Sequence, residues 1–364
     1  MKNEESKLTE LIACFVLYEI GSTTLFQIAA DAGQDAWLAM LIGAAIGLML
    51  LLLYLWIHKM NPNRSLYELC VHFFGKWVGK SVGFILVLYF AYESSRNLRD
   101  LGELAAFALL NRTPLAILML IAIVVVGNSV RYGPQIVFLV CLALLPTVIL
   151  SYLLLIFMII GKGMIHLEFM QPVLENGWGP VVSAALPETV SFPFGQSLLF
   201  LVFFPFVKKD KNLGKAMMIA YTSISAGLIL INQINILVLG PALTKLTMFP
   251  LLQVVQLIEA AEVFERMDVL FVIVLFVGLG TKILMFYVGA VTGLSQMTKI
   301  GYKKWVIPTG LLIYGGSFLS PNFTHHIWLG IDVVLNRVDP YFQFGLPLVL
   351  LSVMLLRRKK RMQK

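Results

Sequence analysis

Two short stretches combine residues that interrupt a helix with residues that offer hydrogen-bonding groups. The first is Gly21-Ser22-Thr23-Thr24, in the middle of an apolar segment. Glycine and β-branched threonine weaken a helix, and hydroxyl groups can satisfy the backbone groups that a break frees within lipid. The second is Ser191-Phe192-Pro193-Phe194-Gly195-Gln196. Here proline removes a backbone donor, disfavours the helical conformation of the preceding residue, and is closely followed by a flexible glycine.

A pair of such breaks can bind a small molecule that carries both charges. A helix N-terminus presents free N–H groups and a positive dipole end, so it attracts a carboxylate. Freed carbonyl groups attract an ammonium group or a cation. We therefore expect residues 22–24 to offer N–H groups and residues 191–193 to offer carbonyls to an amino acid. Phe194 is expected to close this pocket, and Gln196 to tune its polarity.

A stripe of charged and polar residues lies within another apolar segment. Its members recur every three or four residues and so share one helical face: Glu93, Arg96, Asn97, Asp100 and Glu103. A charge at the bilayer centre costs roughly 3 kcal/mol, so such residues usually face protein or a water-filled cavity. We expect Glu93, Arg96 and Asn97 to line the site and to act in gating or coupling. The alternative is that this helix leaves the membrane early and the stripe is solvated.

Lys282 is an isolated charge in the apolar sequence VGLGTKILMFYVG. Because no acidic residue lies within a helical turn, its partner must come from another helix. A buried lysine can act as a fixed cation or exchange a proton, so we assign Lys282 to coupling. The alternative is a side chain that extends to the membrane interface.

Other candidate chemistries have weaker support. Cys14, Cys70 and Cys141 lack the spacing of a disulfide framework or a zinc site. The neighbours His325 and His326 point away from each other on a helix, so we predict no metal site. We also predict no cofactor and no enzyme activity, because no nucleophile–histidine–acid arrangement stands out.

The composition requires lipid around these residues. Of 364 residues, 59% are hydrophobic and 13% are charged, whereas soluble domains carry about 25% charged residues. Apolar runs of about 20 residues can span a bilayer. We predict an all-α polytopic protein with ten spans, at roughly 9–30, 36–58, 81–108, 114–128, 135–160, 184–207, 214–240, 268–297, 303–320 and 342–356.

The basic residues set the orientation of these spans. With the N-terminus in the cytoplasm, twenty of the 28 Lys and Arg residues lie on the inner side and five on the outer side. Cytoplasmic loops carry such an excess, so both termini are predicted to be cytoplasmic. The net charge of +8 then reflects topology and contact with membrane lipid, and not nucleic acid. Residues 64–80 are predicted to lie along the inner interface, and 241–267 along the outer one.

Ten spans divide into two sets of five within a single membrane domain, residues 1–364. We assign residues 1–160 to the first repeat, 184–356 to the second, and 357–364 to a basic cytoplasmic tail. Breaks in the first and sixth spans then occupy equivalent places in inverted halves, and such pairs mark the binding site of a transporter fold.

Longer motifs are spread over the chain: Asp35-Ala36-Trp37, FFGKWVGKSVGFILVLYF at 73–90, QPVLENGWGPVV at 171–182, FPFGQSLLFLVFFPFV at 192–207, and FERMD at 264–268 with Lys282. Together they resemble the permease-like B subunits of bacterial spore germinant receptors, the endospore germination permease family of the amino acid–polyamine–organocation superfamily. The resemblance implies a LeuT-like 5+5 inverted repeat with broken helices 1 and 6, in the spore inner membrane. It implies germinant sensing beside an A subunit and a lipoprotein C subunit, with a site between spans one, three, six and eight.

The leading hypothesis is a receptor subunit that binds a small nutrient, most simply an amino acid, and signals germination through its partners. One alternative is a proton-coupled amino acid transporter, in which Lys282 or Glu93 exchanges a proton in each cycle. A third is a passive pathway for water or ions, which predicts flux without saturation by a ligand.

Overall fold

A computed structural model describes residues 6–259 and 267–362 of the chain. In this part the protein is built from helices and contains no β-strand. The α-helices are α1 (Leu8–Ile20), α2 (Ala36–Met60), α3 (Leu66–Phe74), α4 (Lys76–Ala108), α5 (Leu115–Val130), α6 (Pro134–Gly161), α7 (Trp178–Ala184), α8 (Phe200–Phe203), α9 (Leu213–Leu239), α10 (Pro241–Leu246), α11 (Pro250–Glu259), α12 (Met267–Thr298), α13 (Tyr302–Gly316), α14 (Phe323–Trp328) and α15 (Leu346–Met362).

Shorter helical segments of other pitch connect them. The 3₁₀ segments are η1 (Ala30–Asp35), η2 (Leu167–Met170), η4 (Phe194–Leu199) and η5 (Phe204–Phe206). The π-helical segments are η3 (Ala185–Thr189), η6 (Leu329–Val338) and η7 (Tyr341–Gly345). Such irregular pitch is common at functional sites. Here η3 precedes the predicted second break, and η4 begins within it, at Phe194.

Every predicted span contains a helix. Among the described residues, six helices are long and apolar enough to cross a membrane: Ala30–Met60, Pro134–Gly161, Trp178–Phe206, Leu213–Leu239, Phe271–Thr298 and Phe323–Arg357. The four other predicted spans correspond to α1, α4, α5 and α13. Of these, α1, α5 and α13 are short, and α4 carries the charged stripe. The total of ten spans therefore stays a prediction.

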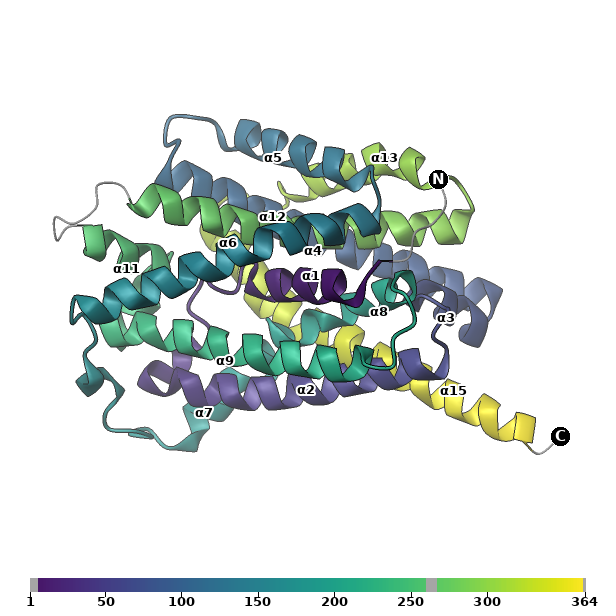
Figure 1. Ribbon diagram of the computed structural model, residues 1–364, viewed down its shortest axis with the longest axis horizontal. Coiled ribbons are helices and arrows are strands. Elements are labelled where there is room, and N and C mark those ends of the chain that lie inside the picture. The colour runs from purple at the N-terminus through teal and green to yellow at the C-terminus, as the bar shows by residue number, and fades with distance from the viewer. Residues whose placement is uncertain (1–5, 260–266, 363–364) are drawn as a thin grey trace.

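The helices form one bundle (Figure 1). In this view α1 and α8 lie in its middle, with α5 and α13 along one edge and α2 and α9 along the other. Helices α4 and α12 pack closely together, and α1 contacts α6, α9 and α12. The last turns of α15 lie at the end of the bundle that holds α3, and α11 lies at the opposite end.

The two interrupted helices run in opposite directions. Ser6, just before α1, forms a parallel bridge with Val207, just after η5. The first interrupted helix thus begins where the second, Trp178–Phe206, ends. Their inner ends pack through edge-on aromatic contacts of Phe15 and Tyr18 with Phe200. This antiparallel pair is the arrangement expected of inverted repeats.

The structure corrects three boundaries. The expected first span, 9–30, is helical only to Ile20, and regular α-helix resumes at Ala36. Helix α4, which corresponds to the expected third span, begins at Lys76 and not at residue 81. Gly75, with a φ of 88°, is the single residue between α3 and α4. The basic tail continues α15 as far as Met362. Part of the segment 241–267 predicted at the outer interface, and residues 264–266 of FERMD, lie outside the described part.

Candidate functional site

The first break is a turn that follows α1 and lies against α12. A Cβ atom at Gly21 would come within 2.7 Å of Lys282 Cδ, and one at Gly278 would lie 3.1 Å from the Gly21 carbonyl oxygen. Glycine at these two positions lets the backbones approach closely, as small residues do in membrane helix packing. Lys282 therefore passes directly beside the turn.

Hydroxyl groups hold this turn together. Thr23 Oγ1 donates to the Glu19 carbonyl at 2.6 Å, and the Thr23 N–H donates to the Ile20 carbonyl at 3.0 Å. The Thr24 hydroxyl lies 2.6 Å from the Tyr152 hydroxyl on α6. The hydroxyls of residues 23 and 24 thus have partners within the protein, and these two residues do not line the cavity described below. Ser22 alone of this run lines the cavity described below.

The second break is a turn at residues 192–193 between η3 and η4. The Gln196 N–H donates to the Pro193 carbonyl at 3.2 Å, which starts the 3₁₀ segment after the turn. Across from it, Gln343 Nε2 donates to the Ser191 carbonyl at 3.1 Å. A Cβ at Gly195 would lie 1.9 Å from Gln343 Oε1, so glycine is required where η7 crosses the break.

A cavity of about 410 Å³ lies between the two breaks, α4 and α14, and we call it the central cavity. Residues 244–248, which run from the last turn of α10 into the connection to α11, also line it, which places it toward the α11 end of Figure 1, away from α3. Its polar lining is Ser22, Gln27, Glu93, Arg96, Asn97, Asp100, Glu188, Gln196, Thr244, Lys245, Thr247 and His326. Its larger apolar lining includes Phe26, Phe192, Met248, Phe323, Ile327, Ile331 and Leu335.

Glu93 joins the second break to the charged stripe. Its carboxylate accepts a hydrogen bond from Gln196 Nε2 at 3.1 Å and lies 3.4 Å from Arg96 Nη1. Asn97 Nδ2 donates to the Glu93 carbonyl at 2.8 Å. The stripe therefore faces inward, as expected, and gives the cavity adjacent negative and positive groups. Such a pair can bind the ammonium and carboxylate of a zwitterion.

A second polar pair lies farther along the same face of α4. Asp100 Oδ1 and His326 Nε2 are 2.8 Å apart, and both residues are buried. Asp100 lies four residues after Arg96, a spacing that allows the two to pair, but the structure pairs Asp100 with a histidine on α14. Arg99 pairs with Glu103 at 2.7 Å, as its spacing predicts.

Lys282 lies behind the wall of the cavity. Its side chain is fully buried, with Nζ 4.5 Å from the centre of the Phe192 ring and 5.3 Å from that of Tyr18. Among the described residues Nζ has no hydrogen-bond partner, and Glu19 Oε1 also has none. Glu19 and Lys282 interact electrostatically. We expected an acidic partner for Lys282 on another helix, and its acidic neighbour Glu19 lies on α1.

The predicted site residues thus fall into two groups. Six line the central cavity: Ser22, Glu93, Arg96, Asn97, Phe192 and Gln196. The others lie behind its wall: Gly21, Thr23, Thr24, Ser191, Pro193, Phe194, Gly195 and Lys282. Phe194, which was expected to close the pocket, does not line the central cavity, and its ring packs against Tyr221 on α9. Phe192 occupies the cavity wall instead.

Several cavity residues were not identified from the sequence. Glu188 lies about one helical turn before Phe192, so helical spacing could have indicated that the two residues face the same side. Phe26 lies two residues after Thr24, but no pattern marked it. His326 and Phe323 reach the cavity from segments distant in sequence. Asp339 is fully buried and interacts electrostatically with Glu93 and Lys282. Among the described residues no group of three or more potential metal ligands occurs.

Comparisons with known proteins give consistent results. A family model described as "Spore germination protein" matches residues 7–322. Spore germination protein KB of Bacillus subtilis (strain 168) is 32% identical over 363 residues, which cover 99% of this chain and 97% of that protein. Spore germination protein B2 of the same strain is 26% identical, over 74% of this chain and 73% of that protein.

Solved structures share the fold at low sequence identity. The transporter Mhp1, in a closed conformation with bromovinylhydantoin bound, gives a TM-score of 0.67 at 14% identity and covers 93% of this chain and 78% of that chain. MhsT in complex with L-phenylalanine gives 0.55 at 14% identity, over 97% of this chain and 99% of that chain. Both are transporters of the LeuT fold, so the expected fold class is confirmed.

Proposed function

The chain belongs to the spore germination protein family, and from this premise we propose that it is the ligand-binding subunit of a germinant receptor. In this proposal a small nutrient, most simply an amino acid, binds in the central cavity. Two further subunits, of the A and C types, read the occupied state. The protein would lie in the spore inner membrane with both termini in the cytoplasm.

The observation that carries the proposal is the arrangement of Glu93. Its carboxylate is buried, lines the cavity, and is held by Gln196 from the second break and by Arg96 from its own helix. An ammonium group of a ligand can join Glu93 while a carboxylate joins Arg96. The aromatic residues Phe26, Phe192 and Phe323 then surround the rest of the ligand.

Signalling requires that the ligand bind two conformations with different affinity. The second break offers such a difference, because Gln196 belongs to the turn and also holds Glu93. A ligand that competes with Gln196 for Glu93 would release one contact between η4 and α4. Partner subunits would respond to the resulting shift between conformations.

A thermal-shift screen of the purified protein against amino acids, sugars and nucleobases tests ligand binding. We expect an amino acid to raise the melting temperature of the wild type. Loss of a charge-assisted hydrogen bond in Glu93→Gln should weaken affinity roughly 10- to 100-fold. Glu103→Gln, on the same helix but outside the cavity, is the matched control. If no amino acid stabilises the wild type, or if Glu93→Gln binds as well as the control, the proposed site is wrong.

The second candidate is a proton-coupled amino acid transporter. The observation that favours it is Lys282, a buried amine beside Glu19 that is separated from the cavity by the Phe192 ring. Uptake of a labelled amino acid into proteoliposomes under a pH gradient separates the two functions. Concentrative, saturable uptake by this chain alone would favour transport, whereas binding without uptake favours the receptor. Flux that does not saturate would instead support a passive pathway.

A further inference from the structure

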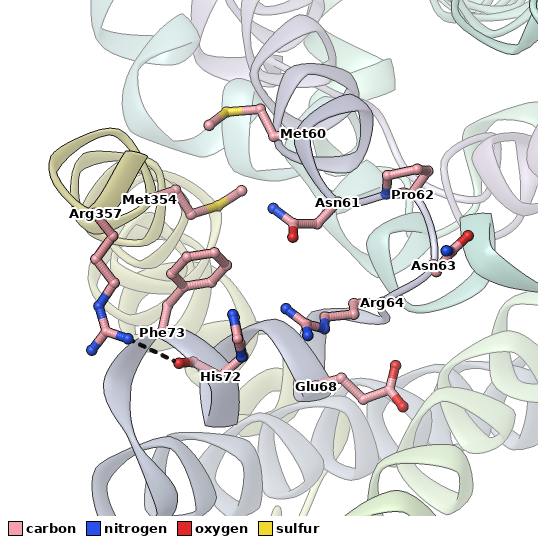
Figure 2. Close-up of a pocket in the computed structure, with 10 residues that line it drawn as sticks. All are labelled: Met60, Asn61, Pro62, Asn63, Arg64, Glu68, His72, Phe73, Met354 and Arg357. Carbon is pink, nitrogen blue, oxygen red and sulfur yellow. Dashed lines mark hydrogen bonds between the residues drawn. The ribbon is translucent and has the colours of Figure 1, made fainter. Parts of the chain in front are cut away.

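A second cavity lies at the opposite end of the bundle from the central cavity. It measures about 890 Å³ and is formed by the end of α2, the loop of residues 61–64, α3 and α15. Figure 2 shows the side chains of Asn61, Arg64 and His72 directed toward one shared opening, with Phe73 and Met354 along its apolar side. We call it the end cavity. Helix α3 and the last turns of α15 lie at this end in Figure 1.

The charged groups of the end cavity favour an anion. Arg64 and Arg357 both line it, and neither forms an ion pair within residues 6–259 and 267–362. Glu68 is the acidic lining residue, but its carboxylate accepts the Ser65 N–H at 2.9 Å and caps α3. Arg357 Nη1 donates to the His72 carbonyl at 3.3 Å, which holds α15 beside α3. The cavity therefore has an excess of cationic donors.

The surroundings of the end cavity favour a lipid over a soluble anion. Trp56 on α2 and Trp77 at the start of α4 are 48% and 82% exposed, and exposed tryptophans concentrate at the level of lipid headgroups. Leu356, next to Arg357, is 66% exposed. An acyl chain can pack along this apolar surface while its phosphate enters the cavity. Basic pockets between membrane helices bind anionic headgroups in this way.

We propose that the end cavity binds the phosphate of an anionic phospholipid. Arg64, with the amide of Asn61 and the ring of His72, contacts the phosphate from the α2–α3 side. Arg357 holds the headgroup from α15. The bound lipid thereby links α3 to the final helix, at the end of the bundle where no ligand of the central cavity can reach.

Native mass spectrometry of the purified full chain, titrated with phosphatidylglycerol and with phosphatidylcholine, tests this proposal. We expect one phosphatidylglycerol to bind in clear preference to phosphatidylcholine. At about fivefold per basic residue near the headgroup, the Arg64→Gln/Arg357→Gln variant should bind roughly 30-fold more weakly. Lys303→Gln/Lys304→Gln removes two exposed charges outside the cavity and should bind as the wild type does.

A second variant and a competition experiment complete the test. Asn61→Asp preserves shape but adds a negative charge beside Arg64, so it should weaken phosphatidylglycerol binding even if the double arginine variant fails to fold. Millimolar inorganic phosphate should not displace the lipid. Wild-type affinity in Asn61→Asp, absence of a preference for phosphatidylglycerol, or equal displacement by inorganic phosphate would each overturn the lipid site.

Discussion

The two helix breaks are stabilised by different interactions. The first turn is held by hydroxyl groups and by the close approach of α12, and its neighbour is the buried amine of Lys282. The second turn is set by Pro193 and is held by Gln343 from η7. The first contributes Ser22 to the central cavity, whereas the second contributes Phe192 and Gln196.

This difference indicates a division of labour. The second break forms part of the cavity wall and contacts Glu93, so changes there should alter both ligand binding and stability. The first break contacts Lys282, which does not line the cavity, so changes there should act on the equilibrium between conformations. Four substitution experiments test this division, in order of decreasing expected effect.

The largest effect is expected from Gly195→Ala. A Cβ there would lie 1.9 Å from Gln343 Oε1 and 2.9 Å from the Val190 carbonyl oxygen. Gln343 would have to give up its hydrogen bond to Ser191, and such overpacking costs about 1–3 kcal/mol. We expect a lower melting temperature and a loss of ligand binding, both measured in a thermal-shift assay.

Gly227→Ala on α9 is the matched control for this substitution. A Cβ at Gly227 would meet no heavy atom within 4 Å, and alanine favours a helix by about 1 kcal/mol over glycine. The control should therefore be neutral or slightly stabilising. Equal losses at the two positions would show that Gln343 does not hold the second break.

At the first break we expect Glu19 and Lys282 to be coupled. Their interaction across the end of α1 should appear in a double-mutant cycle of Glu19→Gln, Lys282→Met and the double variant. We predict a coupling energy of about 1.5 kcal/mol, because either group alone lacks its buried neighbour. Additive effects of the two substitutions on the melting temperature would show that Glu19 and Lys282 are not coupled. Weaker ligand binding in either single variant would contradict the separate roles of the two breaks.

The Asp100–His326 pair should contribute less. Each of Asp100→Asn and His326→Gln should lower stability by about 1 kcal/mol, the usual worth of one hydrogen bond, and the double variant should cost little more than either single change. Unfolding of the purified variants measures this. Because the pair joins α4 to α14 at the edge of the cavity, ligand affinity should fall only slightly. A tenfold loss of affinity would instead place the pair in direct contact with the ligand.

Local signals in the sequence accounted for the breaks and for the stripe on α4. Proline and glycine act on their own backbone, so the turn at residues 192–193 was predictable, and helical spacing brought Glu93, Arg96 and Asn97 to one face. The partner of Asp100 was not predictable, since His326 is 226 residues away on another helix. The end of α1 at Ile20 was predictable, but the absence of regular helix before Ala36 depends on contacts with α9, such as that between Ile28 and Asn232.

Helical spacing also could not decide which phenylalanine of the second break faces the central cavity, because the break interrupts the helical repeat. Phe192→Leu and Phe194→Leu make the same chemical change on opposite sides of the turn. Phe192→Leu should weaken ligand affinity about three- to fivefold, since the ring lines the cavity and leucine would offer the proposed ligand about 1 kcal/mol less aromatic contact. Phe194→Leu should lower the melting temperature through lost packing on Tyr221 and leave affinity unchanged. Binding isotherms and melting curves of the two variants in the same detergent measure both effects, and a reversed pattern would place Phe194 at the ligand.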